Sequence, residues 1–149
     1  MKTENLKLIA TSSEDLRVIA AHLQDAIVSS TDIAHLKKNK ILLVQLNRFM
    51  WEDVEKGIFR KNKRIRTVLK FDNVISVLSK NIAQNEKDNF LEFLTIETNQ
   101  MPDKSYEINL IFSGDAIIKI VSEVIEVKLD DQGDFWESKT KPKHDFLLC

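Results

Sequence analysis

Short segments in which apolar and polar residues alternate occupy most of the chain, and turn-forming residues separate them. In the segment 64–71, Ile65, Leu69 and Phe71 would face one way and basic residues the other. A period of two residues is typical of a strand with one buried face. We therefore expect about seven antiparallel strands joined as a meander. The expected strands are 28–36, 41–50, 64–71, 74–82, 90–98, 106–112 and 116–121.

An amphipathic helix is expected near the N-terminus, before these strands. Ser12 can cap its first turn, and Asp15 completes a capping-box pattern three residues later. Apolar residues then recur at helical spacing from Leu16 to Ile27. The sequence therefore predicts a helix over residues 13–26.

A second helix is expected after the last predicted strand. Apolar residues return to helical spacing between Val121 and Leu129, and Gly133 is placed to end the helix. A strand that continues from 116 to 127 is the alternative interpretation of the same residues. The tail 135–149 contains a proline and mixed charges, so we expect an extended segment on the surface.

These elements predict an α+β protein with a single domain over residues 1–149. Its length and its 43% of hydrophobic residues suit one globular core. A meander must have its apolar face covered. Seven strands followed by a helix is also the order of a pleckstrin-homology-like split barrel, in which the helix plugs one open end. An open sheet with both helices on one face is the alternative.

Composition argues against several classes of protein. The single cysteine, Cys149, has no partner for an intramolecular disulfide. Polar residues interrupt the N-terminus where a signal peptide needs an apolar run, and the longest apolar runs are too short to span a bilayer. We therefore expect a cytoplasmic protein outside the membrane. The three glycines form no phosphate-binding loop and the three histidines have no metal-ligand spacing, so no cofactor or metal is expected.

The net charge of −1 hides a strong asymmetry. Residues 37–70 contain eleven Lys or Arg and three acids, a local charge of +8 that leaves −9 for the rest of the chain. Clustered basic side chains bind RNA or another polyanion by releasing its counterions. The alternatives are solvated side chains that keep an edge strand from aggregating, and a homodimer in which acidic and basic surfaces meet. The densest basic run comprises Arg60, Lys61, Lys63, Arg64 and Arg66.

A second set of candidate residues lies at the ends of two predicted elements. On the N-terminal helix, His22 lies within reach of Asp25. At the end of a strand, Asn47 and Arg48 precede Trp51 in a segment with two large aromatic side chains. These side chains could form a recognition edge. The alternative is that the aromatic residues pack into the core while Arg48 pairs with an acid.

Five short motifs, at 6–10, 14–16, 22–26, 46–52 and 129–136, resemble a known family. The most specific are His-Leu-Gln-Asp-Ala at 22–26 and Leu-Asn-Arg-Phe at 46–49. From residue 6 to about 145 the chain resembles domain-of-unknown-function family 2948 of alphaproteobacteria. The resemblance implies a single-domain architecture. It does not indicate any particular activity, cofactor or catalytic residue. The residues that it singles out would either converge on one groove or form a structural network that holds helix to sheet. They are His22, Gln24, Asp25, Asn47, Arg48, Trp51, Asp131 and Trp136.

The sequence leaves three functional hypotheses. A compact β scaffold with divided charge and no recognisable catalytic set favours a non-catalytic binding or adaptor module with a protein partner. The basic run favours RNA or polyanion binding through 60–66. A small enzyme with a site near His22 is the third hypothesis, and it requires these polar groups to converge in a pocket with perturbed pKa values.

Overall fold

The structure, a computed structural model, describes residues 5–50, 63–83 and 89–137, apart from the side chains of Lys63 and residues 134–137. Within these ranges it has ten strands, one α-helix and two short 3-10 helices. The elements are β1 (Lys7–Ala10), α1 (Ser13–Leu23), β2 (Ile27–Ser29), η1 (Ser30–Asp32), β3 (Ile33–Leu36), η2 (Lys37–Asn39), β4 (Ile41–Phe49), β5 (Lys63–Phe71), β6 (Val74–Lys80), β7 (Phe90–Gln100), β8 (Tyr106–Phe112), β9 (Ala116–Ser122) and β10 (Val127–Glu137).

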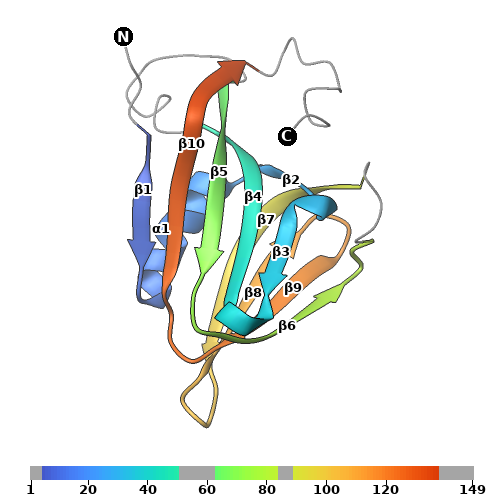
Figure 1. Ribbon diagram of the computed structural model, residues 1–149. Helices are drawn as coiled ribbons and strands as arrows, with labels where there is room; N and C mark the ends of the chain where they lie inside the picture. Colours follow the sequence, from blue (N-terminus) through green and yellow to red (C-terminus); the bar gives the residue numbers. More distant parts are fainter. Residues whose placement is uncertain (1–4, 51–62, 84–88, 138–149) are drawn as a thin grey trace.

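The ten strands form one antiparallel sheet in the order β1-β10-β5-β4-β2-β7-β8-β9-β6, with β3 paired to β4 off this path. The sheet bends into two layers (Figure 1). One layer holds β1, β10, β5, β4 and β3, and the other holds β7, β8, β9 and β6. The bend is at β2, where Ile27 pairs with Asn47 of β4 on one side and Glu92 of β7 on the other. The expected antiparallel α+β class is confirmed, but the expected meander is wrong, because β5 and β6 follow each other in the chain without pairing and β6 pairs with β9.

The core lies between the two layers, where alternate side chains of each strand point inward. In β4, Leu42, Val44 and Leu46 are buried. In the opposite layer, Phe93 and Phe112 meet edge to face, with their ring centroids 6.0 Å apart. Full burial of each such side chain is worth about 1.5–3 kcal/mol, so these inward rows hold the layers together.

Helix α1 packs against β1, β4 and β7 on the β1 side of the molecule (Figure 1). Leu16, Ile19 and Leu23 form its buried stripe, at the spacing of three and four residues that a helix requires. Its first turn is capped as predicted, because Ser12 Oγ accepts a hydrogen bond from the backbone N–H of Asp15 at 3.1 Å. The predicted N-terminal helix is confirmed, with its end at Leu23.

The predicted C-terminal helix is wrong, because residues 116–137 form β9, a turn and β10. Val127 and Leu129 are buried while Lys128 between them is exposed, which is a period of two. β10 pairs with β1 on one side and β5 on the other, and these tertiary pairings favour the strand. Gly133 does not end a helix. Its φ of 72° places it in the irregularity where the register of β10 on β5 shifts, as in a β-bulge.

The other strand predictions hold within a few residues, with two exceptions. The expected strand 28–36 divides into β2 and β3 at η1, where Ser29 Oγ accepts a hydrogen bond from the backbone N–H of Thr31 at 3.3 Å. The edge strand β1 was not expected. With ten strands and no helix after β9 in the described residues, the element order no longer matches a pleckstrin-homology-like barrel. Of the predicted tail, 135–137 belongs to β10 and 138–149 lies outside the described residues.

Candidate functional site

Arg48 and Asp131 form an ion pair in the protein interior. Arg48 lies on the inward face of β4 and Asp131 on the inward face of β10, with β5 between the two strands. Arg48 Nε donates to Asp131 Oδ1 at 2.9 Å, and Nη2 donates to Oδ2 at 2.6 Å. Neither side chain is exposed. This two-point contact is the strongest geometry that a guanidinium and a carboxylate can form.

The same pair fixes the chain next to β1. Asp131 Oδ2 also accepts a hydrogen bond from the backbone N–H of Leu6 at 2.8 Å, and the backbone N–H of Asp131 donates to the Leu6 carbonyl at 3.0 Å. Arg48 Nη1 donates to the carbonyl of Phe49 at 3.0 Å. Both carboxylate oxygens and all three guanidinium nitrogens are therefore engaged within the protein. Two of the eight residues that the resemblance singled out therefore form a buried network, but it joins β4 to β10 and to the chain before β1, and it does not hold the helix to the sheet.

A second polar group lies on the opposite face of β4 and β5. Arg64 Cζ lies 3.7 Å from the centroid of the ring of Phe49, its cross-strand neighbour, and Nη1 donates to the carbonyl of Asn47 at 3.0 Å. Burial lowers the pKa of Arg64 to about 10, while the nearby Asp25 and Glu92 carboxylates act in the opposite direction. Because Arg64 is only 6% exposed, its guanidinium is held against the sheet and is not presented to an external phosphate.

Asp25 and Glu92 form the acidic side of this second group. Asp25 follows α1 with a left-handed φ of 65°, and its backbone N–H donates to the Phe93 carbonyl at 3.1 Å. A hydrogen bond with Asp25 and the loss of hydration raise the pKa of Glu92, and Arg64 acts against this rise. Sequence analysis missed Glu92, since only the register of β7 on β2 brings it to this place.

The basic run predicted to bind a polyanion is only partly described. Arg60 and Lys61 lie outside the described residues, and so does the side chain of Lys63. Arg64 is buried, and Arg66 is half-buried on the same face of β5. Burial raises the pKa of Asp32, and the charge of Arg66 lowers it. Polyanion binding stays a prediction. Arg64 would not contribute to it, because its side chain is buried against the protein.

The remaining predicted residues do not join these two groups into one groove. His22 is half-buried in the last turn of α1, and Gln24 is exposed just beyond it. Trp51 lies outside the described residues. The backbone of Trp136 pairs with that of Arg64, but its side chain is not described. Arg48 and Asp131 face the core, whereas Asn47 lies on the other face of β4.

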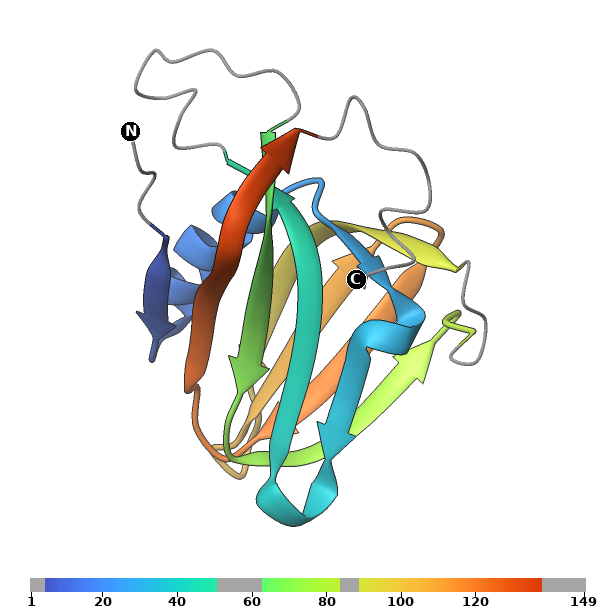
Figure 2. The same ribbon diagram turned by 45° about the horizontal axis from the view of Figure 1, so that its top comes forward.

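A pocket of about 470 Å³ lies between β3 and β6, where the two layers are not joined (Figure 2). Among the described strands β3 pairs only with β4, and β6 only with β9, so each presents a free edge. The volume is in the range of small-molecule sites. The apolar part of its lining consists of Ile33, Leu42, Val77, Ile82 and Ile118.

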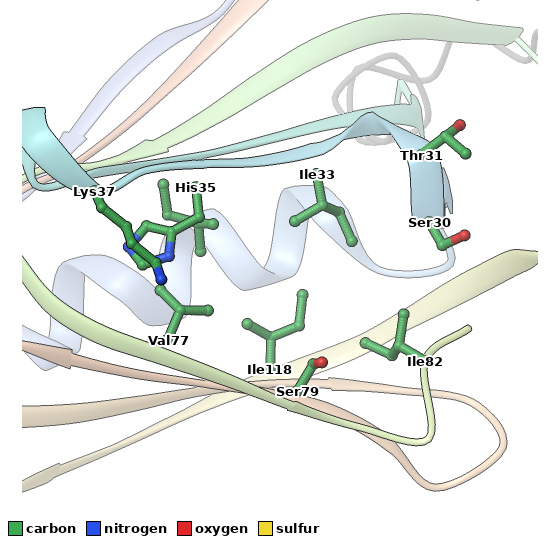
Figure 3. A pocket seen from close by; sticks show the side chains of 10 residues that line it. Ser30, Thr31, Ile33, His35, Lys37, Val77, Ser79, Ile82 and Ile118 are labelled. Carbon is green, nitrogen blue, oxygen red and sulfur yellow. The ribbon is translucent and has the colours of Figure 1, made fainter. Parts of the chain in front are cut away.

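Polar side chains lie toward the two ends of this pocket (Figure 3). His35 and Lys37 are at one end, and Ser30 and Thr31 are at the other. None of the lining residues that the structure describes is an acid. Within the described part of the chain, the side chains of His35 and Lys37 make no hydrogen bond or ion pair with another residue. These residues could not be predicted from the sequence, because the strands that face each other here, 33–36 and 74–80, are distant in the chain.

The described residues contain neither a metal-binding cluster nor a membrane-spanning helix. No group of three or more His, Cys, Asp or Glu within ranges 5–50, 63–83 and 89–137 is placed to hold a metal ion. In the same ranges no helix has the length and apolar character needed to cross a membrane.

Comparison with known proteins identifies the family. The chain matches the family described as "Protein of unknown function (DUF2948)" over residues 6–144, which is nearly its whole length. No curated protein and no solved structure matches the chain. The resemblance that the five short motifs indicated is therefore confirmed. The chain belongs to the DUF2948 family.

Proposed function

We propose that this protein is a non-catalytic binding module whose ligand site is the pocket between β3 and β6. The observation that carries the proposal is the mixed lining of that pocket, in which five apolar side chains alternate with polar side chains that lie mainly toward its two ends. Concave sites that combine apolar walls with a few placed polar groups are typical of small-molecule sites. The proposed ligand is therefore small and partly apolar, in place of the protein partner that the sequence favoured.

The position of the pocket supports this proposal. Its walls come from the edge strands β3 and β6 and from the core residues Leu42 and Ile118. Strands anchored in a core hold side chains in place before a ligand arrives, which reduces the entropy lost on binding. A site of this kind needs no rearrangement of the sheet.

The lining also supports binding in preference to catalysis. His35 is the one histidine among the lining residues, and in the described part of the chain no carboxylate lines the pocket to orient its ring. Catalytic histidines usually have such a partner. The ion pair of Arg48 and Asp131 is buried in the core and does not line this pocket.

A neutral fluorescent probe, N-phenyl-1-naphthylamine, tests the proposal. We expect its fluorescence to rise on binding to the protein, and Ser79→Trp to weaken binding at least about tenfold by filling the pocket. Ser79 is exposed on the pocket side of β6, so the fold should tolerate the change. Leu78→Trp is the matched control, since Leu78 is exposed on the same strand but does not line the pocket. No binding, or equal binding to both variants, would contradict the proposal.

A further inference from the structure

We infer that the ligand of this pocket is an amphipathic anion with a single charged head and an apolar tail. This inference rests on the proposed function and adds the chemical class of the ligand. The head would lie at His35 and Lys37, and the tail would lie along the apolar lining toward η1.

The head site is defined by two donors at the same end of the pocket. His35 and Lys37 both line it, and Figure 3 shows them together at the end away from η1. An ammonium group has three donors and an imidazole ring has at least one N–H. Hydrogen bonds from such groups to a carboxylate or phosphate are stronger than those between neutral groups. The two side chains have no other partner among the described residues, so they are available to a ligand.

The charge around the pocket favours an anion over a cation. Lys37 contributes a positive charge, and none of the described lining residues contributes a negative one. The nearest acid along the chain, Asp32, does not line the pocket, and its charge interacts with that of Arg66 on β5. A cationic ligand would therefore meet a like charge without compensation.

The other end of the pocket explains why one charged head is expected. Ser30 Oγ donates to the carbonyl of Ala83 at 2.9 Å, and the hydroxyls of Thr31 and Ser29 are 2.9 Å apart. These hydroxyls already have partners within the protein, and no charged side chain among the described residues lines this end. Between the two ends the lining is Ile33, Val77 and Ile118, with the small side chain of Ser79 beside Ile118, and these side chains leave room for an alkyl chain.

Displacement of N-phenyl-1-naphthylamine by four ten-carbon competitors tests the inference. These are decanoate, decyl phosphate, decanol and decyltrimethylammonium, all used below their micelle-forming concentrations. We expect decanoate or decyl phosphate to bind at least about tenfold more tightly than decanol, as a charge-assisted hydrogen bond predicts. We expect the ammonium compound to bind most weakly. Whichever anion binds more tightly identifies the head as carboxylate or phosphate.

Two glutamine variants locate the head. Lys37→Gln should remove most of the preference for the anion over decanol, while decanol binding stays within about twofold of the native protein. Lys38→Gln is the matched control, since Lys38 is the next residue, is exposed and does not line the pocket. It should leave the preference unchanged.

The outcomes separate this inference from the proposed function. If the neutral probe binds and Ser79→Trp blocks it, but decanol competes as well as decanoate, the pocket stands and the anionic ligand is wrong. The same conclusion holds if Lys37→Gln and Lys38→Gln behave alike. If the probe does not bind the native protein, the proposed function fails and the inference fails with it.

Discussion

At the scale of single residues, the ion pair of Arg48 and Asp131 is the most constrained contact of the molecule. Taking two charges out of water is costly, and two hydrogen bonds between them offset much of that cost. Removal of one partner leaves the other charge buried and unpaired. Breaking the pair by removing one partner therefore costs more stability than the intact pair adds.

We predict that Asp131→Asn lowers the free energy of unfolding by about 3–5 kcal/mol. The double variant Arg48→Met with Asp131→Leu should lose less than this, because it leaves no buried charge unpaired. Urea denaturation followed by circular dichroism measures both values. A loss below about 1 kcal/mol in Asp131→Asn would show that the interior of the protein hydrates the pair.

The environment of Thr67 leads to a second prediction about stability. It lies between Leu46 and Asp131 in the register of β5, it is fully buried, and its hydroxyl has no hydrogen-bond partner in the described part of the chain. A buried hydroxyl without a partner is destabilising. Thr67→Val should therefore raise the free energy of unfolding by about 1 kcal/mol, which thermal denaturation would show. A clear loss of stability would mean that the hydroxyl is hydrogen-bonded.

The structural role of a residue could be predicted only where its neighbours along the chain decide that role. The alternative in which Arg48 pairs with an acid is correct, but Asp131 is 83 residues away and its role depends on strand register. Arg64 was interpreted as an exposed basic residue, yet it packs on Phe49 across β4 and β5. Nothing in the charge pattern of a single strand distinguishes these two environments.

At the scale of elements, the sequence predicts a helix or strand when the residues that stabilise it lie within that element. Helix α1 has its cap, first-turn acids and buried stripe within 12 consecutive residues. β10 shows the opposite case, since its apolar spacing suits a helix and only its pairing with β1 and β5 makes it a strand. Sequence analysis could therefore predict α1 and could not predict β10.

We expect the stability of the protein to depend on pH through Asp15 in the first turn of α1. A hydrogen bond from the backbone N–H of Thr11, at 3.0 Å, is the main reason that the pKa of Asp15 lies below its ordinary value of 3.8. Because the folded pKa is below the unfolded one, Asp15 stabilises the fold above pH 3.8 and loses this effect as pH falls further. Asp15→Asn should be less stable than the native protein at pH 7.

The matched measurement is urea denaturation of both proteins from pH 7 to pH 3. We expect the difference in unfolding free energy to be constant down to about pH 5 and to shrink as the pH falls through 3.8 and below. If the difference in unfolding free energy does not depend on pH, the charge of Asp15 does not contribute to it, and the effect comes from the changed hydrogen bonds of the side chain.

At the scale of the whole molecule, the uneven distribution of charge is the one sequence feature that the structure does not explain. We predict that RNA binding, if it depends on the basic run, weakens steeply with salt and is lost in the triple variant Arg60→Glu, Lys61→Glu, Lys63→Glu. Arg64 is left unchanged in this variant because it is buried. A titration with little dependence on salt would argue against polyanion binding through this run.

The two-layered shape of the sheet also belongs to this scale. The composition could predict a β-rich core, but the opening between β3 and β6 arises from the path of the whole sheet around the bend at β2. Ile33, His35 and Lys37 have no partner strand in the described residues on that side. The candidate site is therefore a property of the topology, and no short motif of the sequence could have indicated it.

Backbone amide chemical-shift mapping with N-phenyl-1-naphthylamine shows directly whether the pocket between β3 and β6 binds a ligand. If the pocket between β3 and β6 is a ligand site, saturable shifts should concentrate at β3, η1, β6 and the residues of β9 beside Ile118. The amides of α1 and β1 should be unaffected, since they lie on the other side of the sheet. Shifts that are absent, or that concentrate at α1, would contradict the claim and place the function elsewhere on the molecule.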